Sequence, residues 1–195
     1  MDIKIKKLSP DLIEDYIYFH KHVAFKDNSE WSGCYCVWYH WNWKLDLARK
    51  EYENNGGKEF KLELAKRYIT EDKLRGYLAY VDGKVIGWCN ANERQNYTKL
   101  SFDERPDLWK DHNGEKVKSI ICFTIAPNMR RKGLTSVILS EILKDAKKDG
   151  FDYVEAYPGT GKSNDRSYHG TSSIYDKVGF QRLVEDKGIC RKYLK

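Results

Sequence analysis

The chain has 195 residues, of which 35 are Lys or Arg and 29 are Asp or Glu, giving a net charge of +6. This length predicts one domain over residues 1–195, because single hydrophobic cores extend to roughly 250 residues. Charges of both signs are interspersed, no apolar stretch approaches the ~18 residues of a spanning helix, and the N-terminus lacks a signal-peptide core, so we expect a cytoplasmic protein with no nucleic-acid or membrane partner.

The first half of the chain is predicted from hydrophobic periodicity and from helix start signals. Ile and Lys alternate near the N-terminus as in a half-buried strand, and Ser9 followed by Pro10 is typical of a helix start. The predicted elements are a strand at residues 3–6, a helix at 10–25, an ordered loop with short helical pieces at 27–44, and a helix at 58–72.

A hairpin opens the second half of the chain. Asp82–Gly83 supplies the positive φ angles of a tight turn and predicts antiparallel strands at residues 76–81 and 84–90, followed by a polar, irregular connection at 92–115. The remaining predicted elements are a strand at 116–126, a helix at 134–148, a strand at 151–157, a helix at 171–178 and a strand at 188–193. This order predicts an α/β domain whose mixed sheet is covered by helices on both faces.

The segment that follows the strand at 116–126 has the layout of an anion-binding turn. Three consecutive cations and a glycine lead directly into the next helix: Arg130, Arg131, Lys132 and Gly133. A helix N-terminus exposes unpaired N–H groups and the positive end of the helix dipole, so it binds phosphate well. Cations at this position oppose the dipole unless an anion is bound, which favours a phosphate site over a merely solvated charge run.

This turn resembles the acyl-CoA-binding motif of the GCN5-related N-acetyltransferase (GNAT) superfamily, whose pattern is Gln/Arg-x-x-Gly-x-Gly/Ala. Arg130 and Gly133 match the pattern, whereas Thr135 stands where a Gly or Ala is usual. A second resemblance begins at Tyr175, where the sequence matches the family's Tyr-x-x-x-Gly-Phe signature. Two motifs in the right order are more specific than one, and together they mark an acyl-CoA-binding core at about residues 116–195.

The resemblance implies a GNAT-like acyl-CoA N-acyltransferase fold, in which a mostly antiparallel sheet splays between strands 4 and 5. It also implies that acetyl-CoA is the co-substrate and that the pantetheine arm pairs with open backbone groups of the fourth strand. An open sheet edge accepts such an arm as an extra strand. No metal is expected. The residues that would bind acetyl-CoA are Phe123, Thr124, Ile125, Arg130, Arg131, Lys132, Gly133, Leu134, Thr135 and Ser136.

Acyl transfer from a thioester to an amine requires a proton for the departing thiolate. Tyr175 is the predicted general acid, because a phenol pKa of ~10 lies near that of an alkyl thiol and the resemblance implies this role; the alternative is a core tyrosine. Glu155 is the predicted general base, with Glu93 and His169 as alternatives. Tyr168 replaces the Asn that family members carry seven residues before the tyrosine, so the pantetheine contact at that position is altered.

The segment at about residues 27–57 follows the first helix, where the superfamily builds its acceptor pocket. Its tryptophans predict either an apolar wall for the acceptor or a homodimer contact. Cys34, Cys36 and His40 are zinc-ligand types, but Cys-x-Cys lacks the usual ligand spacing, so a packed aromatic loop is favoured over a metal site. Five cysteines without a secretory signal predict reduced thiols.

The leading hypothesis is an N-acetyltransferase that acts on the primary amine of a small molecule or a protein. A second hypothesis is a non-catalytic acyl-CoA sensor of the same fold. A third is a P-loop nucleotide binder, because residues 156–163 approach the Walker A pattern with Ala156 in place of the first glycine. Only 32 residues follow Ser163, too few for the rest of such a fold, so this hypothesis is disfavoured.

Overall fold

The computed structural model describes residues 2–42, 46–55, 57–100, 114–158, 168–184 and 188–195. Its helices are α1 (Ile13–Tyr18), α2 (Asp46–Asn55), α3 (Lys58–Thr70), α5 (Leu134–Lys148) and α6 (Ser172–Asp176). Its strands are β1 (Ile3–Lys7), β2 (Gly76–Val81), β3 (Lys84–Glu93), β4 (Val117–Ile125), β5 (Tyr153–Ala156), β6 (Gln181–Val184) and β7 (Ile189–Tyr193).

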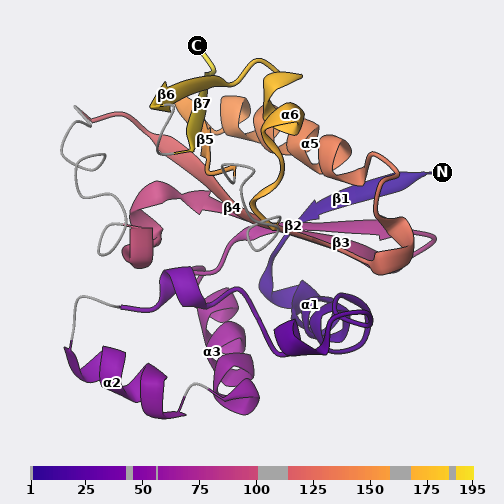
Figure 1. Cartoon of the computed structure of the whole chain (residues 1–195), viewed down its shortest axis with the longest axis vertical. Helices are drawn as coiled ribbons and strands as arrows, with labels where there is room; N and C mark the ends of the chain where they lie inside the picture. Colours follow the sequence, from indigo (N-terminus) through magenta and orange to yellow (C-terminus); the bar gives the residue numbers. More distant parts are fainter. Residues whose placement is uncertain (1, 43–45, 56, 101–113, 159–167, 185–187) are drawn as a thin grey trace.

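The strands form one mixed sheet in the order β1-β2-β3-β4-β5-β7-β6. The β4–β5 pair is parallel, and the other neighbouring pairs are antiparallel. Helices α5 and α6 lie on one side of the sheet, with α1 and α3 on the other (Figure 1). The predicted α/β class, with a mostly antiparallel sheet and helices on both faces, is therefore confirmed.

The hairpin between β2 and β3 turns as its sequence predicts. Asp82 and Gly83 have φ angles of 49° and 75°, the pair of positive values that a primed two-residue turn requires. Helix α5 also has the predicted bounds and buries an apolar stripe against the sheet. These two elements could be predicted because local chemistry alone determines them.

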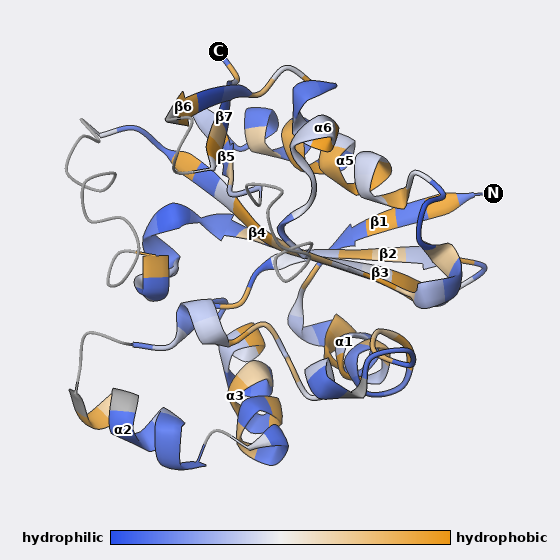
Figure 2. Cartoon of the chain, viewed as in Figure 1, coloured by the Kyte–Doolittle hydropathy of each residue, from blue (hydrophilic) through white to orange (hydrophobic). Residues whose placement is uncertain are grey.

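Other elements differ from the predictions. The helix predicted at residues 10–25 consists of a 3₁₀ turn at Pro10–Leu12, α1, and a π-helical turn at Phe19–Val23. No helix was predicted at residues 46–55, which form α2; this helix is largely hydrophilic and so carries little periodic signal (Figure 2). The edge strand β6 was not predicted either. Among the described residues, no helix is long and apolar enough to cross a membrane.

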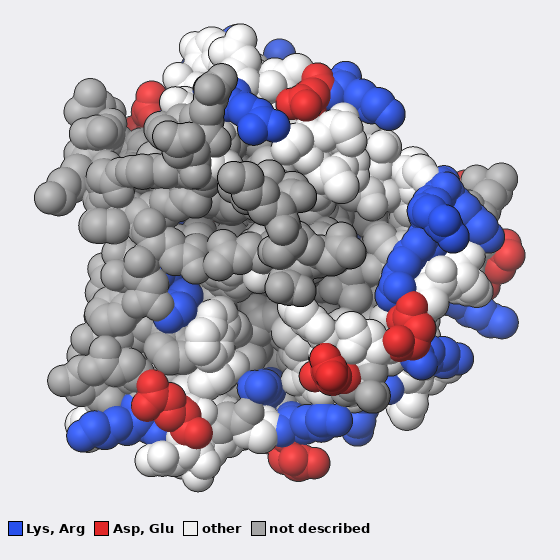
Figure 3. Space-filling view, in the orientation of Figure 1, with Lys and Arg blue, Asp and Glu red and all other residues white. Residues whose placement is uncertain are grey.

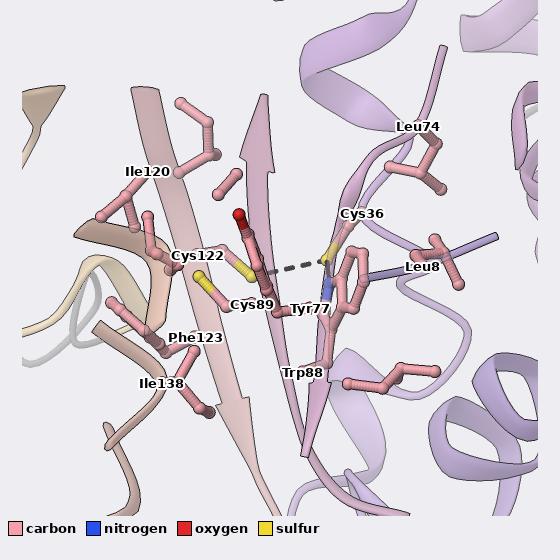
Figure 4. Close-up of a cluster of buried hydrophobic side chains, with 14 of the residues drawn as sticks. Leu8, Cys36, Leu74, Tyr77, Trp88, Cys89, Ile120, Cys122, Phe123 and Ile138 are labelled. Atoms are coloured by element: carbon pink, nitrogen blue, oxygen red, sulfur yellow. Dashed lines mark hydrogen bonds between the residues drawn. The ribbon is translucent and has the colours of Figure 1, made fainter. Parts of the chain in front are cut away.

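The core draws side chains from both sides of the sheet, including the fully buried Trp88 and Ile138 (Figure 4). Trp88 packs edge-on against Tyr16, with ring centroids 4.9 Å apart. Close packing also explains Gly76 at the start of β2, since a Cβ there would stand 2.1 Å from the carbonyl oxygen of Cys89. Any side chain at this position would separate β2 from β3.

The core also holds two neutral imidazoles. Burial lowers the pKa of both His20 and His40 to about 4. Nδ1 of His20 hydrogen-bonds the carbonyl oxygen of Tyr16 at 2.9 Å, while its Nε2 has no hydrogen-bond partner among the described residues. Protonating such a ring would place an unpaired charge in an aromatic environment, so folding favours the neutral form.

We expect these rings to make the protein acid-sensitive. The ordinary histidine pKa is ~6.5, so between pH 6.5 and 4 the unfolded chain binds protons that the folded chain does not, and stability falls as the pH drops through that window. Each ring should cost about 2 kcal/mol at pH 4.5 relative to pH 7. Urea denaturation at both pH values measures this loss. His20→Gln should make the free energy of unfolding less pH-dependent, whereas the exposed His22→Gln should not; equal pH dependence in all three proteins would refute the explanation.

Candidate active site

The site is built around the point where β4 and β5 separate. Their parallel pairing runs from Val117↔Tyr153 to Ile120↔Ala156 and ends there, while β4 continues to Ile125 and stays paired with β3 on its other side. Beyond Ile120, the described residues include no β5 partner for the β4 backbone. This splay is the one predicted, and it leaves the predicted pantetheine-binding stretch, residues 123–125, next to an open edge.

His169 occupies the beginning of the splay. Its Nδ1 donates a hydrogen bond to the carbonyl oxygen of Ile121 at 2.5 Å, which requires the proton to be on Nδ1 because a carbonyl only accepts. The carbonyl oxygen of His169 in turn accepts a hydrogen bond from the hydroxyl of Tyr175 at 2.6 Å. His169 therefore links β4 to α6, which brings this alternative base and the predicted acid together at the splay.

The predicted phosphate turn lies at the end of β4. A 3₁₀ turn at Pro127–Met129 is followed by Arg131 with a φ of 60° and Gly133 with a φ of 79°, and α5 starts at the next residue. Lys and Arg side chains gather on the side of the molecule where this turn and β1 lie (right-hand side of Figure 3). Arg131, Lys132 and Gly133 are exposed, so their side chains and backbone are accessible to an anion.

The predicted acetyl-CoA-binding residues differ in which of their groups, side chain or backbone N–H, are accessible to a ligand. Leu134 is only 2% exposed and packs in the core, so it can contribute its backbone N–H but not its side chain. Ser136 is exposed and its backbone N–H bonds the carbonyl of Gly133 at 3.0 Å, whereas Thr135 is half-buried. The unpaired N–H groups of the first helical turn are therefore concentrated at residues 133–135.

A cavity of about 600 Å³ lies against the open stretch of β4. Its β4 wall is formed by residues 121–125, and Arg130 of the phosphate turn is also part of the lining. The opposite wall comes mainly from the segment after α1, which the sequence associates with the acceptor. The aromatic lining residues outside β4 are Phe25, Trp31, Trp38, Tyr39 and Tyr168.

Two of these aromatic residues meet across the chain. The rings of Trp31 and Tyr168 are 5.4 Å apart, joining the acceptor-side segment to the residue that replaces the family's Asn. Sequence reasoning assigned no partner to either residue. Tyr39 lies near His169, with ring centroids 6.2 Å apart, so the aromatic wall extends to the splay.

An ion pair connects the acceptor-side segment to the phosphate turn. The guanidinium of Arg130 makes two contacts with the carboxylate of Asp27, at 2.5 and 3.1 Å, and its Nε donates to the carbonyl of Ile125 at 3.1 Å. The hydrogen bond from Arg130 lowers the pKa of Asp27. Both side chains are nearly half exposed, at 44% and 46%, so the pair can open when an anion competes for the guanidinium.

Tyr175, the predicted acid, is fully buried on α6 beside Phe180, with ring centroids 5.1 Å apart. Burial raises the pKa of its phenol well above the ordinary value, so the hydroxyl remains protonated at neutral pH. Its hydroxyl is directed to the splay by the hydrogen bond that it donates to the carbonyl oxygen of His169.

Glu155, the predicted base, is fully buried on β5 in a polar cluster. Its Oε2 accepts from Arg191 at 2.5 Å and lies 3.3 Å from Nη1 of Arg94, while Oε1 accepts from the hydroxyl of Tyr157. Burial and the charge of Glu155 raise the pKa of Tyr157 well above its ordinary value. Glu155 is not among the residues that line the cavity.

The remaining sequence alternatives can be placed as well. Glu93, at the end of β3, lies 3.7 Å from Arg75 and outside the cavity lining. In the part of the chain that the structure describes, no group of three His, Cys, Asp or Glu side chains is arranged to hold a metal ion. Of the Walker-like stretch, only Ala156, Tyr157 and Pro158 are described; residues 159–163 lie outside the described ranges.

Comparisons with known proteins agree with this geometry. The model of the acetyltransferase (GNAT) family matches residues 36–180. The PaiA N-acetyltransferase from Thermoplasma acidophilum, in complex with coenzyme A, is similar in structure at 18% identity, with 99% of each chain covered and a TM-score of 0.52. The mosquito protein arylalkylamine N-acetyltransferase like 5b gives a TM-score of 0.59 at 13% identity, with 99% of this chain and 100% of that chain covered. A probable acetyltransferase from Staphylococcus epidermidis gives 0.56 at 13% identity, with both chains fully covered. The comparison with curated proteins gave no match.

Proposed function

Because the chain belongs to the GNAT family of acetyltransferases, we propose that it transfers an acetyl group from acetyl-CoA to the primary amine of a small molecule or a protein. The observation that carries this proposal is the cavity at the splay, which touches both the open stretch of β4 and Arg130 of the phosphate turn. A pantetheine arm extending from that turn along β4 would present the thioester at its end to the acceptor side of the same cavity.

Acetyl-CoA would be held at two places. The pyrophosphate would lie on the backbone N–H groups at the start of α5, with Arg130, Arg131 and Lys132 supplying charge. The pantetheine arm would pair with the open β4 backbone at residues 123–125, as an added strand does at a sheet edge. Backbone donors at the same splay would stabilise the oxyanion of the tetrahedral intermediate.

For the chemistry, we propose Tyr175 as the acid that protonates the departing thiolate, since its phenol stays protonated and is held at the splay by the carbonyl of His169. Glu155 has weaker support as the base, because both of its carboxylate oxygens are already hydrogen-bonded. The carboxylates that do line the cavity belong to Asp27 and Glu30. We assign these two the task of attracting a protonated amine to the aromatic wall, where cation–π contacts would add to the attraction.

The experiment that tests acetyl-CoA binding is calorimetric titration of the wild type and of Arg130→Ala. Charge-assisted hydrogen bonds contribute about 1.5–3 kcal/mol, so the variant should bind acetyl-CoA at least ~10-fold more weakly. Lys147→Ala, an exposed cation at the other end of α5, is the matched control and should bind like the wild type. Equal affinity in all three proteins would remove Arg130 from the site, and ATP binding without acetyl-CoA binding would favour the P-loop hypothesis.

Asp27→Asn, at the other partner of the Arg130–Asp27 ion pair, should change the acetyl-CoA affinity in the opposite direction. If Arg130 leaves Asp27 to contact phosphate, removing the carboxylate charge should tighten acetyl-CoA binding, in contrast to Arg130→Ala. Turnover with a panel of amines then separates an enzyme from the sensor of the second hypothesis, which would bind acetyl-CoA and transfer nothing.

A further inference from the structure

Three thiols line the cavity, those of Cys34, Cys36 and Cys122. The sulfur atoms of Cys36 and Cys122 are 3.4 Å apart, although the residues stand 86 positions apart in the sequence (Figure 4). Cys122 is fixed in β4, whereas Cys36 belongs to the acceptor-side segment and has a φ of 51° outside any regular element. The two walls of the cavity therefore meet through a pair of free thiols.

Their surroundings give Cys34 and Cys36 different reactivities. A hydrogen bond from the Cys36 thiol lowers the pKa of Cys34, which favours its thiolate form. Hydrogen bonds to Cys122 and Cys34 raise the pKa of Cys36 well above its ordinary value. The indole Nε1 of Trp88 also donates to the sulfur of Cys36 at 3.3 Å, which holds that sulfur between its two neighbours.

We propose that this cluster is an oxidation site, in which hydrogen peroxide entering the cavity reacts at Cys34 and the final product is a disulfide between Cys36 and Cys122. Cys34 is the partly exposed member of the three, so it is the one that peroxide meets first. Cys36, whose sulfur contacts that of Cys122, stands two positions further along the chain.

The oxidation takes three steps. The Cys34 thiolate attacks the peroxide O–O bond, taking one oxygen as a sulfenic acid and releasing hydroxide, which becomes water on protonation. The Cys36 thiol displaces water from that sulfenic acid and forms a Cys34–Cys36 disulfide. Cys122 then attacks the Cys36 sulfur and releases Cys34, a better leaving group than Cys36 because its pKa is lower. In total, two thiols and one peroxide give one disulfide and two waters.

The last exchange should be favourable. A disulfide between residues separated by one position closes a short, strained ring, whereas the Cys36–Cys122 bond joins sulfurs that are already in contact. That bond would fix the acceptor-side segment to β4 across the cavity, so acetyl transfer should stop until the disulfide is reduced. Only this loss of transfer rests on the proposed function; the formation of the bond does not.

The test is peptide mapping of the protein after treatment with hydrogen peroxide and blocking of the remaining thiols. Trypsin places Cys34 and Cys36 in the peptide of residues 27–44, and Cys122 in the peptide of residues 119–130. The expected product is a cross-link of these two peptides that is lost on reduction. Chymotryptic cleavage after Tyr35 separates Cys34 from Cys36 and shows which of them is bonded to Cys122.

Variants complete the test, each checked for native circular dichroism. Cys36→Ser and Cys122→Ser should abolish the cross-link, Cys34→Ser should slow it at least tenfold, and Cys190→Ser, a buried thiol on β7, should leave it unchanged. Absence of the cross-link, a Cys34–Cys122 bond, or an unchanged rate in Cys34→Ser would overturn the proposal. Turnover should fall at least tenfold with the cross-link and return with dithiothreitol; an unchanged turnover in the cross-linked protein would overturn its effect on catalysis.

Discussion

Replacing Glu155 with Gln should lower the free energy of unfolding by about 3 kcal/mol or more, the cost of removing one partner from a buried ion pair. The carboxylate is fully buried between Arg94 and Arg191, whose side chains are only 7% and 11% exposed. Without its charge, two guanidinium groups would remain in a region that water barely reaches. The midpoint of urea denaturation should fall without a change in its slope.

The matched control is Glu141→Gln, which breaks an exposed pair with Lys144 and should change stability by no more than about 0.5 kcal/mol. If the two variants were equally stable, the buried cluster would contribute nothing. The Glu155→Gln variant also tests Glu155 as a base. Loss of turnover in the folded protein at a permissive temperature would assign it a catalytic role, whereas normal turnover would leave it a structural one.

Replacing Tyr175 with Phe should reduce kcat by about 100-fold or more, the usual contribution of a general acid, while acetyl-CoA affinity stays the same. The variant removes the hydrogen bond to the carbonyl of His169, so a loss of about 1 kcal/mol in stability is also expected. Steady-state kinetics with an amine that the wild type acetylates measures kcat, and titration with acetyl-CoA measures the affinity separately.

Tyr157→Phe provides the control for that structural loss. Tyr157 is also a buried tyrosine, hydrogen-bonded to Glu155 and to Ser119 at 2.9 Å, and its removal should affect stability but not the chemical step. A similar fall in kcat in both variants would mean that Tyr175 acts through packing. Unchanged kcat in Tyr175→Phe would remove the residue as the acid.

The parts of the fold that could be predicted are those with local causes. The Asp82–Gly83 turn needs two positive φ angles, and α5 has an apolar stripe bounded by Gly133 and Gly150, so short windows of sequence were sufficient. Helix α2 was not predicted because it has few apolar residues and therefore little hydrophobic periodicity. One of them, Leu47, is 84% exposed and does not belong to a buried face. The four-residue β6 depends on pairing with β7, which no local signal reports.

The candidate site likewise has parts with local causes, which could be predicted, and parts that depend on long-range contacts, which could not. The predicted phosphate turn is continuous in sequence, so its cations and glycine could be recognised together, and its role in binding stays a prediction. The Arg130–Asp27 pair joins residues 103 positions apart, so nothing in the sequence linked them. Glu155 was predicted as the base because a residue on the fifth strand could face the acceptor cleft, but its arginine partners, which come from β7 and from the turn after β3, have no local signal. Long-range pairing of this kind decides whether a polar residue serves chemistry or packing.

The aromatic cavity gives the molecule an optical probe of its own. Trp31 and Trp38 line it and are 38% and 40% exposed, whereas Trp41 and Trp88 are buried. The emission wavelength of an indole depends on its contact with water. A ligand that fills the cavity should therefore shift the emission of Trp31 and Trp38 and leave that of the buried Trp41 and Trp88 unchanged. Occupancy can therefore be followed by intrinsic fluorescence in the unlabelled protein, before any acceptor has been identified.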